Sequence, residues 1–155
     1  MYARDDTIIA TPIGDVRLTS DGQWLTSVSI GQFGPAKPPV SRLLRSAADQ
    51  LHAWMSGQQT DFDLPLLPAA TPRGQALRAA IAAIGYGETM SYGALARTIG
   101  SGARAVGQAC ARNPFPIIIP CHRVLAAGGA LGAYSGGDGP VTKKWLLDHE
   151  QHIRR

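Results

Sequence analysis

The chain has 155 residues, of which 45% are hydrophobic, so it is long enough to fold around a core of its own. No run approaches the ~18 consecutive apolar residues of a membrane span. The start "MYARDDTIIA" carries acidic residues where a secretion signal is basic and then apolar. We therefore expect a cytoplasmic protein without membrane contacts. The net charge of +4 is modest, and the two cysteines, Cys110 and Cys121, form no CxxC pair, so neither a disulfide scaffold nor a zinc site is supported and no metal is expected.

The first part of the chain predicts a small antiparallel sheet followed by a helix. Runs of β-prone residues at 7–11, 16–20 and 24–30 are separated by the turn signals "PIGD" and "DG". After a loop rich in proline and glycine, an apolar stripe at helical spacing predicts a helix that begins at Ser41 and ends at Gly57.

The rest of the chain is predicted to be mainly helical. After the proline-broken stretch "TDFDLPLLPAATP", whose last two residues are an N-cap threonine and a proline at the first helical position, a helix continues to Gly85. Two further helices are predicted at 91–99 and at 103–113, and a glycine-containing turn between two short helices is typical of a helix-turn-helix. Residues 124–134 ("VLAAGGALGAY") predict a tight hairpin, and Pro140 begins a last helix.

These elements together predict an α+β fold. We expect a small N-terminal α/β domain with an antiparallel sheet, residues 1–70, packed on a mostly helical C-terminal domain, residues 71–155, that contains the helix-turn-helix. The charges are uneven: residues 1–91 hold seven Lys/Arg and eight Asp/Glu, whereas residues 92–155 hold eight and three. That basic excess suits nucleic acid, although a solvated basic surface gives the same pattern.

Cys121 is the candidate nucleophile. It follows three isoleucines and a proline, which stiffen the approach to it, and His122 and Arg123 follow at once. A basic neighbour favours the thiolate form of a cysteine, but adjacent side chains of an extended segment point apart, so a turn is needed to bring them together. Without such a turn, a buried and inert cysteine is the simpler interpretation.

The motifs around Cys121 resemble those of the O6-alkylguanine-DNA alkyltransferases. "PCHRV" is preceded by "NPFPIII" and followed by "GAYSGG". "YGETMSYGALA" at 86–96, "ARAVGQA" at 103–109, "RNP" at 112–114 and "KKWLLDHE" at 143–150 are similar to the family in order and spacing. The resemblance is strong from Tyr86 to Glu150 and looser before it.

This resemblance implies a DNA repair protein that flips O6-alkylguanine out of double-stranded DNA and transfers the alkyl group irreversibly to Cys121. It implies a single-turnover methylated-DNA--protein-cysteine S-methyltransferase that needs no cofactor. The family also implies a monomer whose helix-turn-helix approaches the minor groove with low sequence specificity.

The resemblance assigns roles to individual residues. Glu150 orients His122, His122 takes the Cys121 proton through a water molecule, and Asn113 supports the turn. Tyr92 helps to rotate the nucleotide out, and Arg104 fills the gap that the base leaves. The residues implied around the flipped base and its alkyl group are Val124, Tyr134, Ser135, Gly136 and Lys143.

The sequence departs from the family at Arg73 and Arg78, which stand where large apolar residues are usual. Arg123 is compatible with an ion pair or with a phosphate contact, and Cys110 needs no function beyond filling space.

Three other functions are alternatives to the transferase. A lesion-binding protein without transfer usually lacks the cysteine, a plain helix-turn-helix regulator does not need the other site residues, and nothing points to the acyl substrate of a cysteine hydrolase.

Overall fold

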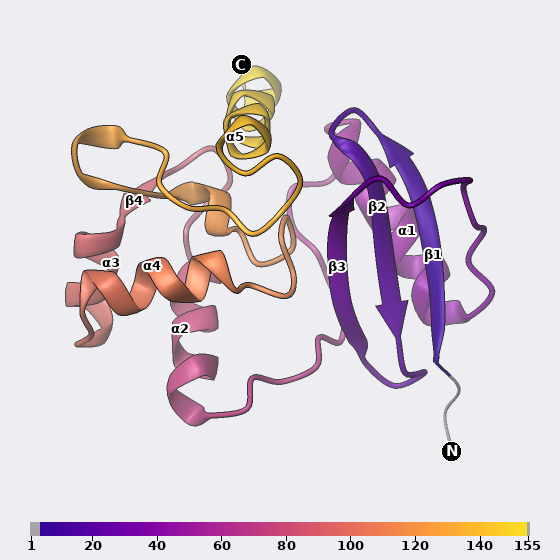
Figure 1. Ribbon diagram of the computed structural model, residues 1–155, viewed down its shortest axis with the longest axis horizontal. Coiled ribbons are helices and arrows are strands. Elements are labelled where there is room, and N and C mark those ends of the chain that lie inside the picture. Colours follow the sequence, from indigo (N-terminus) through magenta and orange to yellow (C-terminus); the bar gives the residue numbers. More distant parts are fainter. Residues whose placement is uncertain (1–3, 155) are drawn as a thin grey trace. The chain divides into compact units, whose positions relative to one another are not determined.

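The computed structural model describes residues 4–154, which divide into two compact units, Met1–Leu67 and Pro68–Arg155 (Figure 1). In the first unit, β1 (Asp5–Thr11), β2 (Gly14–Ser20) and β3 (Leu25–Gly31) form an antiparallel sheet in that order. Each strand alternates buried and more exposed residues, because successive side chains point to opposite faces of a sheet. One face of this sheet is therefore apolar and has to be covered.

Helix α1 (Arg42–Met55) covers that face and contacts β1 and β2. The helix begins where the Ser41 hydroxyl accepts a hydrogen bond from the Leu44 amide at 3.2 Å, which satisfies one of the free amides of the first turn. Its buried side chains are Leu44, Ala47, Ala48, Leu51 and Trp54. Their spacing puts them on one face of the helix, as the sequence predicts.

In the second unit the described residues form the α-helices α2 (Pro72–Ala82), α3 (Tyr92–Ile99), α4 (Ala103–Ala111) and α5 (Pro140–Arg154). Thr71 and Ser91 cap α2 and α3, each accepting a hydrogen bond at 3.0 Å from the amide three residues further on. Gly100 ends α3 with a φ of 66°, a left-handed conformation that favours glycine. Helices α3 and α4 pack against each other across this short turn and form the helix-turn-helix.

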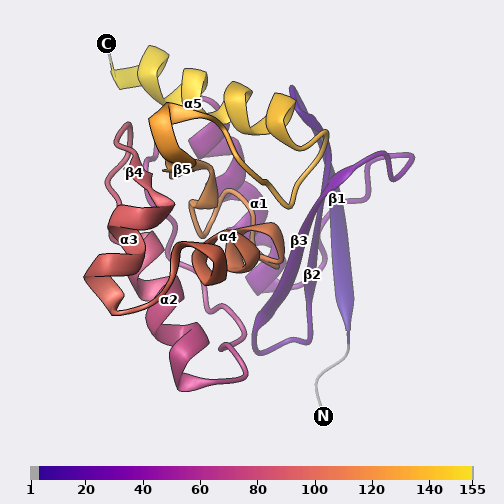
Figure 2. The same cartoon turned by 60° about the vertical axis from the view of Figure 1, so that its left-hand side comes forward.

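Two short strands join distant parts of the second unit. β4 (Met90–Ser91), directly before α3, pairs in parallel with β5 (Val124–Leu125), which follows the 3-10 turn η1 (Cys121–Arg123). The pairing fixes the start of the helix-turn-helix beside the segment that carries the cysteine. Figure 2 shows α5 beside this segment, and α5 contacts η1.

The predicted hairpin at 124–134 is wrong. Only Val124 and Leu125 are in a strand, and their partner is β4; the 3-10 turn η2 (Ala127–Gly129) follows, and the Ala126 amide bonds the Ala130 carbonyl. The glycines make a turn as expected, but the residues after them are alanine, leucine and glycine, which lack the β-branched side chains of a returning strand. Within residues 4–154, no helix is long and apolar enough to cross a membrane.

Candidate active site

Cys121 opens the turn η1 and is 1% exposed. Its amide donates to the Ile119 carbonyl at 2.7 Å. Asn113 supports the same turn from the end of α4: its Nδ2 donates to the Ile119 carbonyl at 3.0 Å and its Oδ1 accepts from the Phe115 amide at 2.9 Å. Asn113 therefore fixes both ends of the segment that leads to the cysteine.

Ile117 lies in the middle of this segment with a φ of 76°. A left-handed backbone is unfavourable for a β-branched residue, and it persists where the surrounding structure enforces it. The Ile117 side chain is 2% exposed, so its burial holds the strained backbone in place. The turn that the sequence analysis requires at Cys121 and His122 is present as η1, and a strained residue precedes it.

Glu150 on α5 joins the two residues that follow the cysteine. Its Oε2 atom lies 2.5 Å from His122 Nε2, and Arg123 contacts both carboxylate oxygens, with Nε at 3.0 and 3.1 Å and Nη2 at 3.0 Å. Arg123 also donates to the Ile84 carbonyl at 2.6 Å, and the Gly87 amide donates to Glu150 Oε1 at 2.9 Å. All three charged or polar side chains are buried. Arg123, which sequence reasoning left undecided, is therefore in a buried ion pair with Glu150.

The protonation states of this cluster follow from its surroundings. Burial raises the pKa of the Glu150 carboxyl, but the hydrogen bonds and charges of His122 and Arg123 outweigh it and lower the pKa to about 2. Burial lowers the pKa of His122 and outweighs the opposite effect of Glu150. At neutral pH the pair is consequently a carboxylate and a neutral imidazole. Because a carboxylate only accepts, Nε2 carries the imidazole proton and Nδ1 is the basic nitrogen.

Cys121 has a second thiol as its neighbour. The hydrogen bond with Cys110 of α4 is the largest cause that raises the pKa of Cys121 well above its usual value, and burial acts in the same direction. The same hydrogen bond lowers the pKa of Cys110. Cys110, which the sequence suggests only as a filler, is buried and influences the pKa of the candidate nucleophile. No sequence signal could have found this contact, because nothing in the spacing of the two cysteines shows which face of α4 meets the turn.

Lys143 is fully buried and connects the predicted base-binding residues. Its Nζ donates to the Val124 carbonyl at 2.6 Å, to the Ala133 carbonyl at 3.1 Å and to the Tyr92 hydroxyl at 3.5 Å. The Tyr92 hydroxyl accepts from the Ala133 amide at 3.1 Å. Burial lowers the pKa of Lys143 and raises that of Tyr92. The structure therefore brings three of the predicted residues together through one ammonium group.

Tyr134, Ser135 and Gly136 follow this contact. Tyr134 is buried, and its ring meets the His122 ring edge-on at 6.5 Å between centroids. Burial raises the pKa of Tyr134 well above its usual value, so its hydroxyl stays protonated. Ser135 is exposed and Gly136 is buried. No hydrogen bond or ion pair described for residues 4–154 links the Ser135 side chain to the cysteine.

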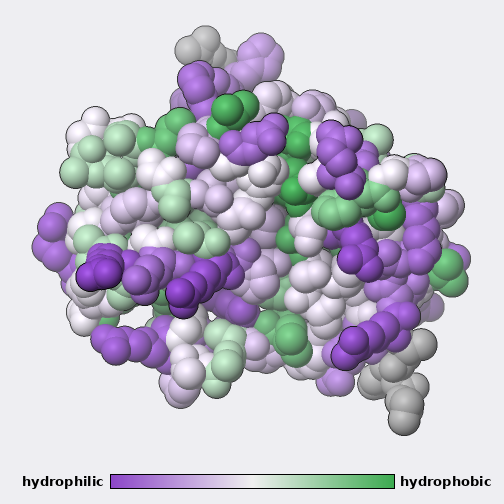
Figure 3. Space-filling view, in the orientation of Figure 1, coloured by the Kyte–Doolittle hydropathy of each residue, from purple (hydrophilic) through white to green (hydrophobic). Residues whose placement is uncertain are grey.

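Arg104 lies on the exposed face of α4, away from the buried cluster. Gln108 and Arg112 are exposed four and eight residues further on, so the three side chains share one face. Figure 3 shows hydrophilic side chains in a band across α4 in this orientation. The residues between them are small, so the helix offers a basic and unobstructed surface.

A cavity of about 180 Å³ reaches Cys121 from the side of α2 and α4. Its lining includes Leu77, Arg78, Ile81, Ala109, Ile119 and Cys121. The Arg78 guanidinium lies 5.2 Å above the Phe115 ring, and burial lowers its pKa. Arg73 is exposed. Of these two arginines, only Arg78 therefore lies against an aromatic ring.

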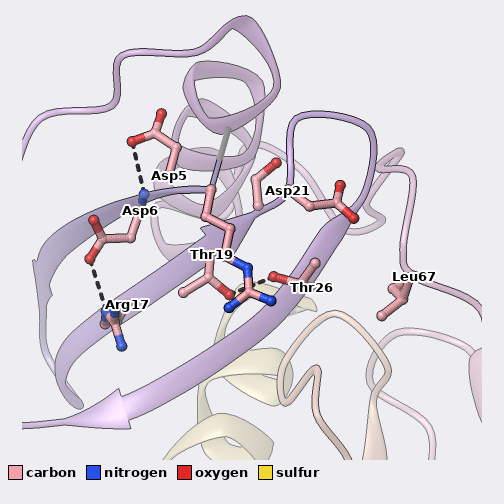
Figure 4. Close-up of a pocket in the computed structure, with 9 residues that line it drawn as sticks. Asp5, Asp6, Arg17, Thr19, Asp21, Thr26 and Leu67 are labelled. Carbon is pink, nitrogen blue, oxygen red and sulfur yellow. Dashed lines mark hydrogen bonds and ion pairs between the residues drawn. The ribbon is translucent and has the colours of Figure 1, made fainter. Parts of the chain in front are cut away.

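A larger cavity of about 560 Å³ lies in the first unit, on the strands (Figure 4). Its polar groups already bind one another: Asp6 accepts from Arg17 at 2.9 Å and is also paired with Lys37, and the Thr19 and Thr26 hydroxyls are 2.7 Å apart. It contains none of the predicted site residues. Across residues 4–154, no group of three His, Cys, Asp or Glu side chains is arranged to hold a metal ion.

Comparison with known proteins identifies the family of the chain. Residues 73–152 match the family model described as 6-O-methylguanine DNA methyltransferase, DNA binding domain. A Mycobacterium tuberculosis relative named Methylated-DNA--protein-cysteine methyltransferase is 40% identical over 150 residues, which cover 92% of this chain and 90% of the relative. The constitutive Methylated-DNA--protein-cysteine methyltransferase of Bacillus subtilis is 34% identical and covers 94% of each chain.

Solved structures lead to the same class of protein. The crystal structure of Mycobacterium tuberculosis O6-methylguanine methyltransferase is similar with a TM-score of 0.84 and 37% identity, covering 97% of this chain and 94% of that one. A structure of the Mycobacterium tuberculosis protein in complex with DNA has a TM-score of 0.81 and 38% identity, covering 94% and 92%. The chain therefore belongs to the methylated-DNA--protein-cysteine methyltransferase family, and its α+β fold is that of the family.

Proposed function

We propose that the protein repairs O6-alkylguanine in double-stranded DNA by moving the alkyl group onto Cys121. The observation that carries the proposal is the buried array next to that cysteine: an ionised Glu150 that holds a neutral His122, with Arg123 fixing the carboxylate. A neutral, oriented imidazole is the group needed to take a proton from a nucleophile. The family to which the chain belongs supplies the reaction class.

The transfer needs a proton acceptor because the pKa of the Cys121 thiol is raised. His122 accepts the thiol proton through a water molecule, and the sulfur attacks the alkyl carbon at O6. The new C–S bond forms as the C–O6 bond breaks, the electron pair stays on the guanine, and the guanine takes up the proton that the thiol lost. Since nothing in this reaction regenerates the thiol, each molecule acts once.

The remaining predicted residues hold the extruded nucleotide. Tyr92 and the carbonyl of Val124 lie together through Lys143, at the place where a flipped base has to enter. Tyr134 gives that place an apolar wall, and Ser135 and Gly136 complete the side that faces O6. Arg104, on the exposed face of α4, takes the position of the extruded base in the minor groove. We propose that the protein acts as a monomer and reads the lesion rather than the sequence around it.

Mass spectrometry tests the proposal directly. Incubation of the full chain with a short duplex that contains one O6-methylguanine should add a single methyl group, and peptide mapping should place it on Cys121. Cys121→Ser is the control, because a hydroxyl of similar size is a far weaker nucleophile at neutral pH. The variant should still bind the duplex but gain no methyl group.

The other outcomes separate the alternative functions. Tight binding of the lesion by the unaltered chain without any gain in mass would replace the transferase by a lesion-binding protein. Equal binding of damaged and undamaged DNA, again without transfer, would leave the helix-turn-helix regulator. A methyl group found on the Cys121→Ser variant would show that another residue is the acceptor.

A further inference from the structure

Glu150 is held by a backbone amide as well as by side chains. The Gly87 amide donates to its Oε1 at 2.9 Å, and this hydrogen bond is buried. Gly87 is itself buried and has a φ of 77°, a left-handed conformation that glycine adopts readily. The alkyl transfer proposed above needs Glu150 to orient His122, so the groups that keep the Gly87 amide in place also affect that reaction.

Gln151 holds the same glycine through its carbonyl. It follows Glu150 on α5, and its Nε2 donates to the Gly87 carbonyl at 2.6 Å. The amide and the carbonyl of Gly87 belong to the two peptide groups on either side of its Cα, so the two hydrogen bonds together fix both of its backbone dihedral angles. Since glycine has more conformational freedom to lose than any other residue, its position depends on such partners.

The segment that ends at Gly87 also holds the counter-ion of Glu150. Arg123 Nη1 donates to the Ile84 carbonyl at 2.6 Å, and the guanidinium carbon lies 5.5 Å from the centroid of the Tyr86 ring. The segment therefore contacts both members of the buried ion pair. A change in the backbone at Gly87 consequently moves the carboxylate relative to its partners.

We propose that Gln151 is a positioning residue for alkyl transfer: it fixes Gly87, and through the Gly87 amide it keeps the Glu150 carboxylate oriented toward His122. Gln151 is exposed, and it acts through two successive hydrogen bonds rather than through contact with the base. The inference rests on the proposed function, because the orientation of His122 affects the rate only if His122 takes the Cys121 proton.

Loss of the Gln151 hydrogen bond has a defined effect on His122. The Gly87 amide helps to stabilise the negative charge of Glu150. When that hydrogen bond weakens, the carboxylate attracts the imidazolium more strongly, so the pKa of His122 rises. The acid limb of the pH–rate profile then moves to higher pH, because His122 has to be neutral to accept the thiol proton. The other groups that face His122 are not changed by a substitution at position 151; they are Arg123, Lys143 and Tyr134.

The experiment compares single-turnover rates of methyl transfer across a range of pH for the full chain and for two variants at this position. Gln151→Met keeps nearly the same shape and helix propensity but has no donor. We expect its rate to be lower by about two- to tenfold, the range that one hydrogen bond spans, with the acid limb at higher pH. Gln151→Arg supplies a donor again and should restore both the rate and the profile.

Gln50→Met is the matched control. Gln50 also donates from its side-chain amide to a backbone carbonyl, that of Asp63 at 3.0 Å, but it lies in the first unit. This variant should keep the rate and the acid limb of the unaltered chain, and urea denaturation shows whether the two methionine variants lose similar stability.

The proposal is overturned if Gln151→Met keeps the rate and the acid limb of the unaltered chain. It is equally overturned if Gln50→Met slows transfer as much as Gln151→Met does, or if Gln151→Met and Gln151→Arg are equally slow. No methyl transfer by the unaltered chain would instead refute the proposed function, and the inference would fall with it.

Discussion

Glu150 has two cationic or basic partners and almost no contact with water. Its carboxylate contacts His122 and Arg123, and all three residues are at most 5% exposed. Such a cluster has already lost its hydration, so its stability depends on keeping every partner. Removing the charge of Glu150 leaves a buried guanidinium without its counter-ion.

We therefore predict that Glu150→Gln lowers the free energy of unfolding by about 3 to 5 kcal/mol. It should also slow alkyl transfer, because His122 loses the carboxylate that orients it. Urea denaturation measures the first effect and single-turnover kinetics the second.

Asp148→Asn is the control on the same helix. Asp148 pairs with Lys144 at 2.6 Å, but both side chains are 66% exposed, and breaking an exposed pair costs less than about 1 kcal/mol. Equal losses of stability in the two variants would mean that burial does not determine the importance of Glu150.

At the scale of single residues, the sequence predicts the candidate reactive residues but does not predict the residues that surround them. The candidate nucleophile, base and orienting carboxylate follow from motifs, and the structure brings His122 and Glu150 into contact. The partners of Arg123, Lys143 and Cys110 do not follow, because each is set by the packing of a distant helix against the turn. A buried lysine is uncommon enough that only the three-dimensional arrangement of its acceptors explains it.

The loop between β5 and α5 lies against Tyr92 and forms the side of the site where we propose that the base binds. Five of its glycines, at positions 128, 129, 132, 137 and 139, have positive φ, so its path depends on residues without side chains. Gly132 has an additional constraint, since a Cβ atom there would lie 2.5 Å from the Tyr92 hydroxyl oxygen. This close approach places the loop directly over Tyr92.

We predict that Gly132→Ala displaces Tyr92. Alkyl transfer should therefore be slower than in a variant that has the same backbone strain but leaves Tyr92 in place. Gly129→Ala is the matched control: its φ of 82° gives similar backbone strain, but a Cβ atom there meets nothing within 4 Å. Both variants should lose about 1 kcal/mol of stability from the left-handed backbone. Only Gly132→Ala should bind a duplex with O6-methylguanine more weakly, as measured by titration with labelled DNA; equal binding by both would refute the contact.

At the scale of elements, the capped helices were predictable and the loop was not. Ser41, Thr71 and Ser91 each cap the helix that the sequence assigned to them, because a hydroxyl before an apolar stripe is a local signal. The parallel pairing of β4 with β5 is not local, since it joins residues more than thirty positions apart. Two-residue strands also carry too short a pattern to be recognised.

For the molecule as a whole, the buried acid and base make stability depend on pH. The pKa of Glu150 falls from 4.5 to about 2, so its contribution is present above pH 4.5 and is lost as the pH falls through about 2. The pKa of His122 is also lower in the folded chain than its usual 6.5, so the unfolded chain binds that proton more readily and stability begins to fall below about pH 6.5. The two effects have the same sign.

We predict that the urea midpoint of unfolding decreases steadily on acidification from about pH 7 to about pH 4. In a His122→Asn variant the part of this decrease nearest neutral pH should be smaller, because the side chain no longer takes up a proton. A midpoint that is constant over this range in the unaltered chain would show that neither group is shifted as the structure indicates. Composition and charge do not reveal this behaviour, because they count ionisable groups without saying which are buried.

The left-handed Ile117 limits how the reactive segment can be transplanted. "PCHR" looks like a portable motif, but the chain reaches it through a strained residue that its own burial and the Asn113 side chain hold in place. Grafted alone onto another scaffold, these four residues would lose the turn that the preceding segment imposes, and His122 would lose Glu150. An engineer who wants this acceptor elsewhere has to move the segment from Asn113 to Arg123 together with the helix that carries Glu150.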